Sequence, residues 1–401
     1  MASILNIKTP IKFDNSISKI EFHSYNPFLT SYDTSDEIRI AVQHQDLYLL
    51  PSESFLLIEG SLTEIVSPNT ASLSNNAMSF LFDEIRYELN GIEIDRTRHT
   101  GITSALKNYV SLTPSESTMS YKAAWYPPES GQIAPNNGNF NFCVPLKLLL
   151  GFAEDYKKIM INAKHELVLI RSRTNANAMV TSSETSVPKL KISKIQWHMP
   201  HVTVADEEKL RLLKIVGSGQ PIKMNFRSWD MYEYPILPTT NHHTWTIKTS
   251  NQLEKPRYII VAFQTDRKNL YGKDSSQFDH CELTDIKAFL NSEKYPYNDM
   301  NIKYSHDQYT LLYDMYTRFQ QSYYGNTNQP LLTWRAFKNN APIVVIDCSR
   351  QNESVKAGPV DVKLEMKFSS NLNSKTTGYC LLLHDRIVEY NPLTSEVKKF
   401  T

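Results

Sequence analysis

The strongest constraint on the fold is a repeated order of strand-like segments in the two halves of the chain. The run EIRYELNGIEID passes through the turn dipeptide Asn90 and Gly91, and DIKAFLNSEKYP repeats that order around Asn291, 201 positions later. A helix-forming segment follows in each half. Three more pairs keep nearly the same offset: PSESFLLIEGSL with PRYIIVAFQT, NFCVPL with IVVIDC, and HELVLI with VKLEMKF. Four pairs in one order predict a tandem duplication.

The repeated unit is predicted to be all-β. Short runs rich in β-branched and aromatic residues alternate with Asn, Pro, Ser and Gly clusters, which is typical of antiparallel sandwiches or barrels. Helical periodicity is confined to residues 103–110, 146–160, 206–215 and 307–323. The strand-like runs are EIRIAV, SFLLIEGSL, EIRYEL, HELVLI, KLKISKIQW, KMNFRSW, RYIIVAF, PIVVID, VKLEMKF and GYCLLL.

The boundary between the units is predicted at the polar segment ADEEKLRLLKIVGSGQP. We expect Asp206 to cap a short helix and Gly217 to end it. A plain linker explains this segment, and a regulatory hinge is the alternative. The expected division is residues 1–205 for the first unit, with an N-terminal arm at about 1–20, then a linker helix at 206–220 and a second unit at 221–401.

Composition narrows the classes of function. The 43 basic and 42 acidic side chains nearly cancel and form no basic block, so sequence-specific nucleic-acid binding is not expected. The four cysteines show no CxxC spacing, and we expect reduced, mostly buried thiols rather than a zinc knuckle or a disulfide framework. The apolar runs are too short to insert in a membrane, and the N-terminus lacks a signal-peptide pattern, so synthesis and folding in the cytosol are expected.

The sequence carries no familiar catalytic motif. GxxxxGK[ST], GxGxxG, GxSxG and HExxH are all missing. His198 and His201 stand three residues apart, a spacing that would place them on one face of a helix. Pro200 and the preceding KISKIQW favour a strand, in which positions three apart point to opposite faces. We therefore expect no metal site there.

The adjacent His242 and His243 are interpreted in the same way. Neighbours in a strand project to opposite sides, and a metal would need ligands from elsewhere, although Asp230 and Glu233 are close in sequence. We expect both histidines to lie in a connection before a strand HTWTIK that places Trp245 and Ile247 on one face. Pro235 and Pro238 are expected to bend the chain where the second unit begins, and Trp229 and Trp245 are expected to fill its sandwich.

Two further groups of side chains have structural explanations. Carboxylate clusters at Asp83 and Glu84, Glu154 and Asp155, and residues 206–208 are expected on solvated surfaces, and a glycosidase pair stays an alternative. An amphipathic helix docked on a sheet is expected from aromatic residues at three- and four-residue steps: Tyr309, Tyr313, Tyr316, Phe319 and Tyr323. We predict no catalytic, cofactor-binding or metal-binding residue and no enzymatic activity.

The order of segments resembles the double jelly-roll major capsid proteins, and within them the branch encoded by Maverick/Polinton elements and adintovirus-like viruses. The resemblance extends over some 300 residues. It is carried by FDEIRYELNGIEID with Arg98 and Gly101, VPLKLLLGF, HELVLIRSR, IQWHMPHV, WDMYEYPILP, KPRYIIVAFQTDRKN, FDHCELTDIKAFLNSEKYP and the tyrosine-rich helix.

This resemblance implies two tandem eight-stranded jelly-roll sandwiches with a few short helices in loops. It implies homotrimeric, pseudo-hexameric capsomers in an icosahedral capsid around double-stranded DNA. The implied partners are the chain itself, in the trimer and in neighbouring capsomers, and a penton or minor capsid protein. The implied location is the virion, after synthesis in the host cytoplasm and assembly in the cytoplasm or nucleus.

Other interpretations stay open at this point. Tandem β-sandwiches also occur in carbohydrate-binding and carbohydrate-active proteins, and a minor capsid protein or a domesticated capsid gene would keep the same fold. Inter-strand segments 113–138, 174–188 and 271–279 are expected to form towers or trimer clasps, or else plain surface loops. The N-terminal arm is expected to tie to a neighbour or to a base layer.

Overall fold

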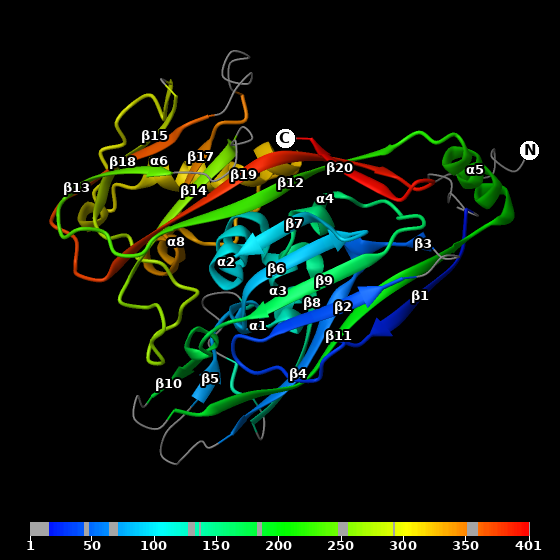
Figure 1. Cartoon of the computed structure of the whole chain (residues 1–401). Coiled ribbons are helices and arrows are strands. Elements are labelled where there is room, and N and C mark those ends of the chain that lie inside the picture. Colours follow the sequence, from blue (N-terminus) through cyan, green and yellow to red (C-terminus); the bar gives the residue numbers. More distant parts are fainter. Residues whose placement is uncertain are drawn as a thin grey trace, which may run out of the picture.

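The computed structural model places two β-rich halves side by side, and helix α5 (Asp206–Gly217) lies at one end of the molecule between them in sequence (Figure 1). The structure describes residues 16–43, 48–63, 71–126, 133–135, 138–182, 187–247, 256–291, 293–350 and 360–400. The first 15 residues of the predicted arm lie outside these ranges, and residues 17–20 belong to strand β1.

The first half is built from two antiparallel sheets. One sheet has the strand order β1 (Ile17–Tyr25), β11 (Lys189–Val204), β4 (Phe55–Thr63) and β8 (Asn139–Pro145), with β3 (Tyr48–Leu49) paired to β11. The other has the order β2 (Glu37–Val42), β9 (His165–Arg171), β6 (Phe82–Leu89) and β7 (Ile92–Arg98). The short strands β5 (Ala71–Leu73) and β10 (Met179–Thr181) pair with each other.

The second half repeats the topology of the two four-stranded sheets. Its first sheet has the order β12 (Ile222–Tyr234), β19 (Thr376–Asn391), β14 (Pro256–Thr265) and β17 (Val344–Asp347), with β20 (Glu396–Phe400) paired to β19. Its second sheet has the order β13 (His242–Ile247), β18 (Val362–Phe368), β15 (Leu283–Leu290) and β16 (Glu293–Tyr295). All ten predicted strand-like runs contribute to these strands. The predicted fold class, two eight-stranded jelly rolls in tandem, is confirmed.

The helices are short and lie in the connections. They are α1 (Ala77–Phe80), α2 (Thr100–Ser111), α3 (Pro114–Met119), α4 (Gly151–Asp155), α5, α6 (Thr310–Thr317), α7 (Phe319–Tyr324) and α8 (Trp334–Asn340). The helix predicted over 307–323 is two helices, α6 and α7, with Arg318 as the C-cap of the first and the N-cap of the second. The helix predicted over 146–160 shrinks to α4 after a turn of 3₁₀ helix at Leu146–Leu148.

The helix predicted between the units forms, but its cap differs from the prediction. Ala205 occupies the N-cap position and Asp206 is the first helical residue, because the Ala205 carbonyl accepts the first helical hydrogen bond, from the Lys209 N–H at 2.9 Å. Gly217 is the last helical residue rather than the stop, and Ser218 follows as the C-cap. None of the residues of α5 is buried.

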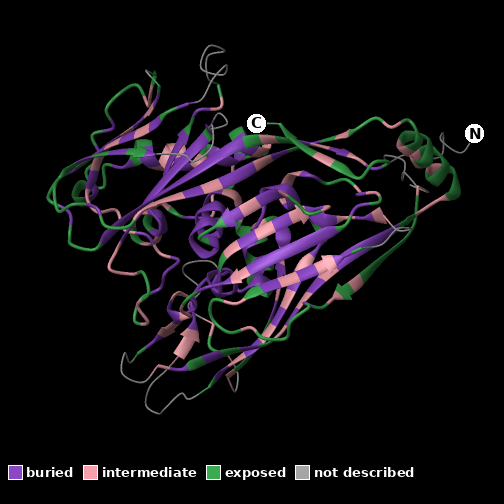
Figure 2. Ribbon diagram, in the orientation of Figure 1, coloured by how far each residue is buried: buried purple, intermediate pink, exposed green. Residues whose placement is uncertain are grey.

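One continuous set of apolar side chains fills both sandwiches (Figure 2). Along β4 buried and half-buried positions alternate, as expected for a strand with one face on the core. Trp125 and Trp197 in the first half and Trp229 in the second are at most 1% exposed. Trp125 lies within the segment predicted as a tower loop, yet it is held inside the molecule by α3, where its indole N–H donates to Ser117 Oγ at 3.0 Å.

The prediction that Pro235 and Pro238 bend the chain where the second half begins was wrong. They lie in the connection between β12 and β13, because β12 has already begun at Ile222. The burial of Trp229 and of Trp245, which is 8% exposed, is confirmed.

Buried His165 is expected to make the stability of the first half depend on pH. Its Nδ1 lies 2.5 Å from the Tyr87 hydroxyl, and burial lowers the pKa of His165 to about 3. The unfolded chain takes up a proton at this position as the pH falls below about 6.5, whereas the folded chain does so only near pH 3. The free energy of unfolding should therefore fall between pH 6.5 and 3, by up to about 1.4 kcal/mol per pH unit from this residue.

We predict that His165→Asn flattens this pH dependence, whatever its effect on stability at pH 7. Urea unfolding from pH 7 to pH 4, followed by tryptophan fluorescence, measures the slope. His242→Asn, at an exposed position of β13, is the control and should keep the wild-type slope. An unchanged slope in His165→Asn would show that other groups cause the acid sensitivity.

Candidate functional site

Buried polar side chains gather at the seam where the two halves meet. The first half contributes β7, α2 and α4 to this seam, and the second half contributes β12, α7 and the β19–β20 hairpin. Figure 1 shows α2 and α4 lying between the two sets of strands. The seam fixes how one sandwich is held against the other.

An ion pair between Asp155 and Arg227 closes the open edge of β12. The carboxylate of Asp155 accepts from the Arg227 guanidinium at 2.6 and 2.8 Å and from the Arg227 backbone N–H at 2.8 Å. The Arg227 guanidinium also lies 3.5 Å from the centre of the Tyr323 ring. Because a bidentate Arg–carboxylate pair has a defined geometry, this contact sets the register between α4 and β12.

A buried lysine forms a second contact across the seam. Lys107 of α2 is 2% exposed, and its Nζ donates to Glu154 at 2.8 Å and to the Tyr324 hydroxyl at 2.7 Å. Its ammonium group also lies 4.8 Å from the centre of the Trp229 ring. Burial lowers the pKa of Lys107, and the Glu154 carboxylate opposes this shift. A buried charge is tolerated here because it is paired and hydrogen-bonded.

A buried carboxylate makes a third contact. Asp95 of β7 is 1% exposed and accepts from the Ser228 hydroxyl of β12 at 2.8 Å and from the Phe152 N–H at 2.8 Å. Burial raises the pKa of Asp95, while the nearby Arg386 and these hydrogen bonds lower it in part.

The C-terminal hairpin β19–β20 clasps the first half. The Tyr390 hydroxyl donates to the backbone carbonyl of Asn162 at 2.5 Å, and the Asn162 side chain donates to the Pro392 carbonyl at 3.0 Å. The Asn90 side chain, at the turn of the first repeat, donates to the Ser395 carbonyl at 2.9 Å. These bonds hold the far end of the seam.

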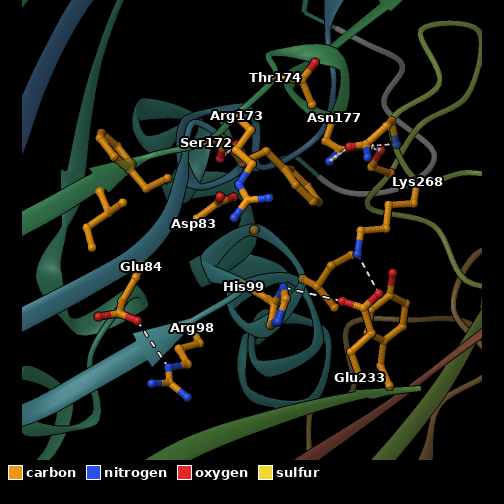
Figure 3. A pocket seen from close by; sticks show the side chains of 18 of the residues that line it. Asp83, Glu84, Arg98, His99, Ser172, Arg173, Thr174, Asn177, Glu233 and Lys268 are labelled. Atoms are coloured by element: carbon orange, nitrogen blue, oxygen red, sulfur yellow. Dashed lines mark hydrogen bonds and ion pairs between the residues drawn. The ribbon is translucent and has the colours of Figure 1, made fainter. Parts of the chain in front are cut away.

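A pocket of about 540 Å³ lies at the seam, lined from both halves (Figure 3). Glu233 of β12 projects into it and pairs with His99 at 3.6 Å and with Lys268 at 2.5 Å. Glu84 pairs with Arg98 at 3.2 Å. Because both carboxylates are engaged by cations, the pocket has the chemistry of an ion-paired joint rather than of a free acid/base pair.

The four histidines considered as metal ligands in the sequence analysis lie apart from the seam. His198 and His201 both lie in β11, as predicted; the His198 ring stacks on Phe55, whereas His201 bonds to the Tyr25 hydroxyl at 2.7 Å. His242 and His243 begin strand β13 instead of lying in the connection before it. The ladder with β18 starts at His242, opposite Lys367, and His243 is buried with its Nε2 2.8 Å from the Thr240 carbonyl oxygen.

Two of the three carboxylate clusters lie at the surface, and one does not. Asp83 and residues 206–207 are exposed, with Glu84 and Glu208 half-buried. The prediction of a solvated surface was wrong for Glu154 and Asp155, whose side chains are each 15% exposed because the second half covers α4. Asp230 lies 3.6 Å from His384, away from Glu233 and its partners.

The predicted docking of the tyrosine-rich segment is confirmed. Tyr309, Tyr316 and Phe319 are at most 2% exposed, and the Tyr316 hydroxyl donates to the Tyr109 carbonyl of the first half at 3.0 Å. All four cysteines are free; Cys348 and Cys380 are buried, whereas Cys143 and Cys281 are half-buried.

Within the described ranges no group of three or more His, Cys, Asp or Glu side chains could hold a metal ion. In the same part of the chain, no helix has the length and apolar character needed to cross a membrane.

Comparison with known proteins identifies the family. The family model described as a double jelly roll-like domain matches residues 71–388, and the chain belongs to this family. No significant match was found among curated protein sequences.

Several solved viral structures share the fold. The Sputnik virophage structure has a TM-score of 0.64 at 10% identity, over 98% of this chain and 91% of that chain. The mavirus major capsid protein has a TM-score of 0.57 at 10% identity, over 100% and 93%. The faustovirus major capsid protein has a TM-score of 0.61 at 9% identity, over 96% and 93%. The closer resemblance to Maverick/Polinton elements stays a prediction.

Gly151 allows the close approach of the two halves. A Cβ at this position would collide with the Arg227 carbonyl oxygen and lie 3.2 Å from Trp229 Nε1. We predict that Gly151→Ala lowers the free energy of unfolding by about 1–3 kcal/mol, as overpacking does elsewhere. The control is Gly217→Ala, because a Cβ there meets no atom within 4 Å. Denaturant unfolding gives the free energy of unfolding of both variants. Equal values would contradict the prediction and show that the seam accommodates an added methyl group without cost.

The Lys107–Glu154 pair is predicted to be strongly coupled. Lys107→Met and Glu154→Leu should each cost about 3 kcal/mol, because each strands a buried charge, whereas the double variant should cost much less than the sum. Urea unfolding of the wild type, the two single variants and the double variant measures the coupling.

Asp385→Ala is the control. It breaks an ion pair with Arg257 that is about half exposed and should lower the free energy of unfolding by less than about 1 kcal/mol. If the double variant lost as much stability as the sum of Lys107→Met and Glu154→Leu, the predicted coupling would be wrong.

Proposed function

We propose that this chain is a major capsid protein, which self-assembles as homotrimers and forms an icosahedral shell around a double-stranded DNA genome. The observation that carries this proposal is the pair of like sandwiches held side by side by a closely fitted seam. Three such chains supply six similar walls, the number that a pseudo-hexagonal capsomer needs. The solved capsid proteins that share the fold do so along nearly their whole length.

The physics of a shell suits such a molecule. A shell is stabilised by many modest contacts in parallel, so each subunit needs a fixed shape more than a single strong site. A seam with polar contacts from both halves keeps the two sandwiches at one angle, since any rotation between them would separate Asp155 from Arg227, Lys107 from the Tyr324 hydroxyl and Asp95 from the Ser228 hydroxyl.

The proposal includes partners and location. The chain would bind copies of itself and a penton or minor capsid protein, and it would lie in the virion capsid after synthesis in the host cytoplasm, with assembly in the cytoplasm or nucleus. It would have no enzymatic activity. A carbohydrate-active role has less support, because Glu84 and Glu233 in the seam pocket are held by Arg98 and Lys268.

The proposal predicts the mass of the purified protein. Native mass spectrometry should show a species of three times the 46.2 kDa chain, and electron microscopy should show three-fold particles with a pseudo-hexagonal outline or closed shells. A strictly monomeric protein at high concentration, with no particles under any assembly condition, would overturn the proposal. The Gly151→Ala variant should form fewer particles than the Gly217→Ala control.

A further inference from the structure

Strand β11 is longer than the strand that covers one of its two edges. On one side β4 pairs with residues 189–198, whereas on the other side β1 pairs only with residues 197–204. Residues 189–196 therefore have no neighbour on the β1 side among the described strands. Figure 1 shows β1 beside the end of β11 nearest α5, while the uncovered end of β11 runs toward β5 and β10.

A proline explains why β1 covers only half of this edge. Pro27 has no backbone N–H and cannot continue the ladder with β11. The Asn26 side chain still accepts from the Gln196 amide at 2.8 Å, but the Phe28 N–H already donates to the Arg39 carbonyl of β2 at 3.1 Å. The chain thus crosses to the other sheet, and the first part of the β11 edge is left open.

A groove of about 980 Å³ lies beside the open edge. Its other walls are residues 30–34 of the β1–β2 connection and residues 171–175, at the end of β9 and after it. The Leu190 carbonyl accepts the Asn175 side chain at 3.5 Å, so it points into the groove and away from β4. Because alternate residues of a strand direct their backbone groups to the same side, Ile192 also presents its N–H and C=O to the groove.

The groove is strongly basic. Four cations line it, namely Arg171, Arg173, Lys189 and Lys191, whereas Asp33 is the one carboxylate among the described lining residues. Arg173 and Lys191 are exposed, and neither forms an ion pair with a described residue. The chain as a whole carries a net charge of only +1, so this concentration of positive charge is local.

Arg171 adds a buried charge to the wall of the groove. Its side chain is 2% exposed and donates only to neutral oxygens: the Tyr32 carbonyl at 3.2 Å, the Asn175 side chain at 2.7 Å and the Leu81 carbonyl. Burial lowers the pKa of Arg171 to about 10, so the guanidinium is still charged at neutral pH. A buried charge without a counter-ion favours the approach of an anion.

We propose that this groove binds an extended, acidic segment of a partner protein, which adds as a strand to the open edge of β11. Backbone groups of the segment would pair with Leu190 and Ile192, and its carboxylates would meet Lys191 and Arg173. The segment would replace the single long hydrogen bond from Asn175. This binding site goes beyond the proposed function, and it needs no second copy of the chain.

The open edge distinguishes a peptide from other anions. An edge strand offers both N–H donors and C=O acceptors, and an extended peptide satisfies both kinds of group at once. Phosphate and sulfate groups only accept hydrogen bonds, so a nucleic acid or a sulfated glycan would leave the Leu190 carbonyl without a better donor than Asn175.

Charge reversal tests the basic wall. The probe is a fluorescein-labelled heptapeptide of alternating glutamate and valine, and its fluorescence anisotropy on titration with the full-length protein gives the affinity. Lys191→Glu and Arg173→Glu should each weaken binding at least about tenfold, because each places like charges together. Both side chains are exposed, so the melting temperature should not change. Lys223→Glu, on β12 at a side chain that is 69% exposed, is the control and should bind as the wild type does.

Backbone methylation tests the added strand. A fully N-methylated peptide of the same sequence keeps the carboxylates and loses its N–H donors, so it should bind at least about tenfold more weakly. The unmethylated peptide should also slow the amide hydrogen exchange of residues 189–196, which a contact through side chains alone would not do.

The possible results separate the interpretations. No binding of the unmethylated peptide to the wild type, or unchanged binding by either charge variant, would overturn the proposal. Equal affinity for the methylated peptide or for a heparin hexasaccharide would overturn it in favour of a site for anions in general. If both charge variants instead lost self-association, the groove would be a contact between copies of the chain and not a peptide site. None of these results would contradict the proposed capsid function, which the native mass decides.

Discussion

The arrangement of the two sandwiches depends on how the open edge of β12 is closed. An edge strand presents unpaired N–H and C=O groups that favour pairing with other chains. Here the Asp155 carboxylate accepts from the Arg227 N–H, and the backbone of Gly151 lies against the Arg227 carbonyl, so α4 occupies the edge instead of another strand. The same contact that protects the edge joins the two halves.

Polar groups rather than apolar ones make this joint specific. Apolar surfaces pack in many ways at similar cost, whereas the hydrogen bonds from Lys107 to Tyr324 and from Ser228 to Asp95 form in only one arrangement of the two halves. The desolvation of these groups is compensated by their hydrogen bonds, and the result is a single orientation of the two sandwiches.

The sequence permitted prediction of the sandwiches far better than of the seam. Strand periodicity and the Asn90 and Asn291 turns are local signals, and a duplication supplies each signal twice, so the topology could be predicted. The partners of Glu154 are Lys107, 47 positions away, and Tyr324, 170 positions away, and a pair of adjacent acids carries no local signal of such partners. The ends of the short helices were also hard to predict, because a single hydrogen bond, such as that from the Lys209 N–H to the Ala205 carbonyl, decides where a helix begins.

Covalent tethering explains why a polar seam is sufficient to join the two halves. Within one chain the second half is held near the first at high effective concentration, so a polar contact that contributes orientation more than affinity is sufficient. The Asp155–Arg227 ion pair, the Lys107–Tyr324 hydrogen bond and the Asp95–Ser228 hydrogen bond supply that orientation.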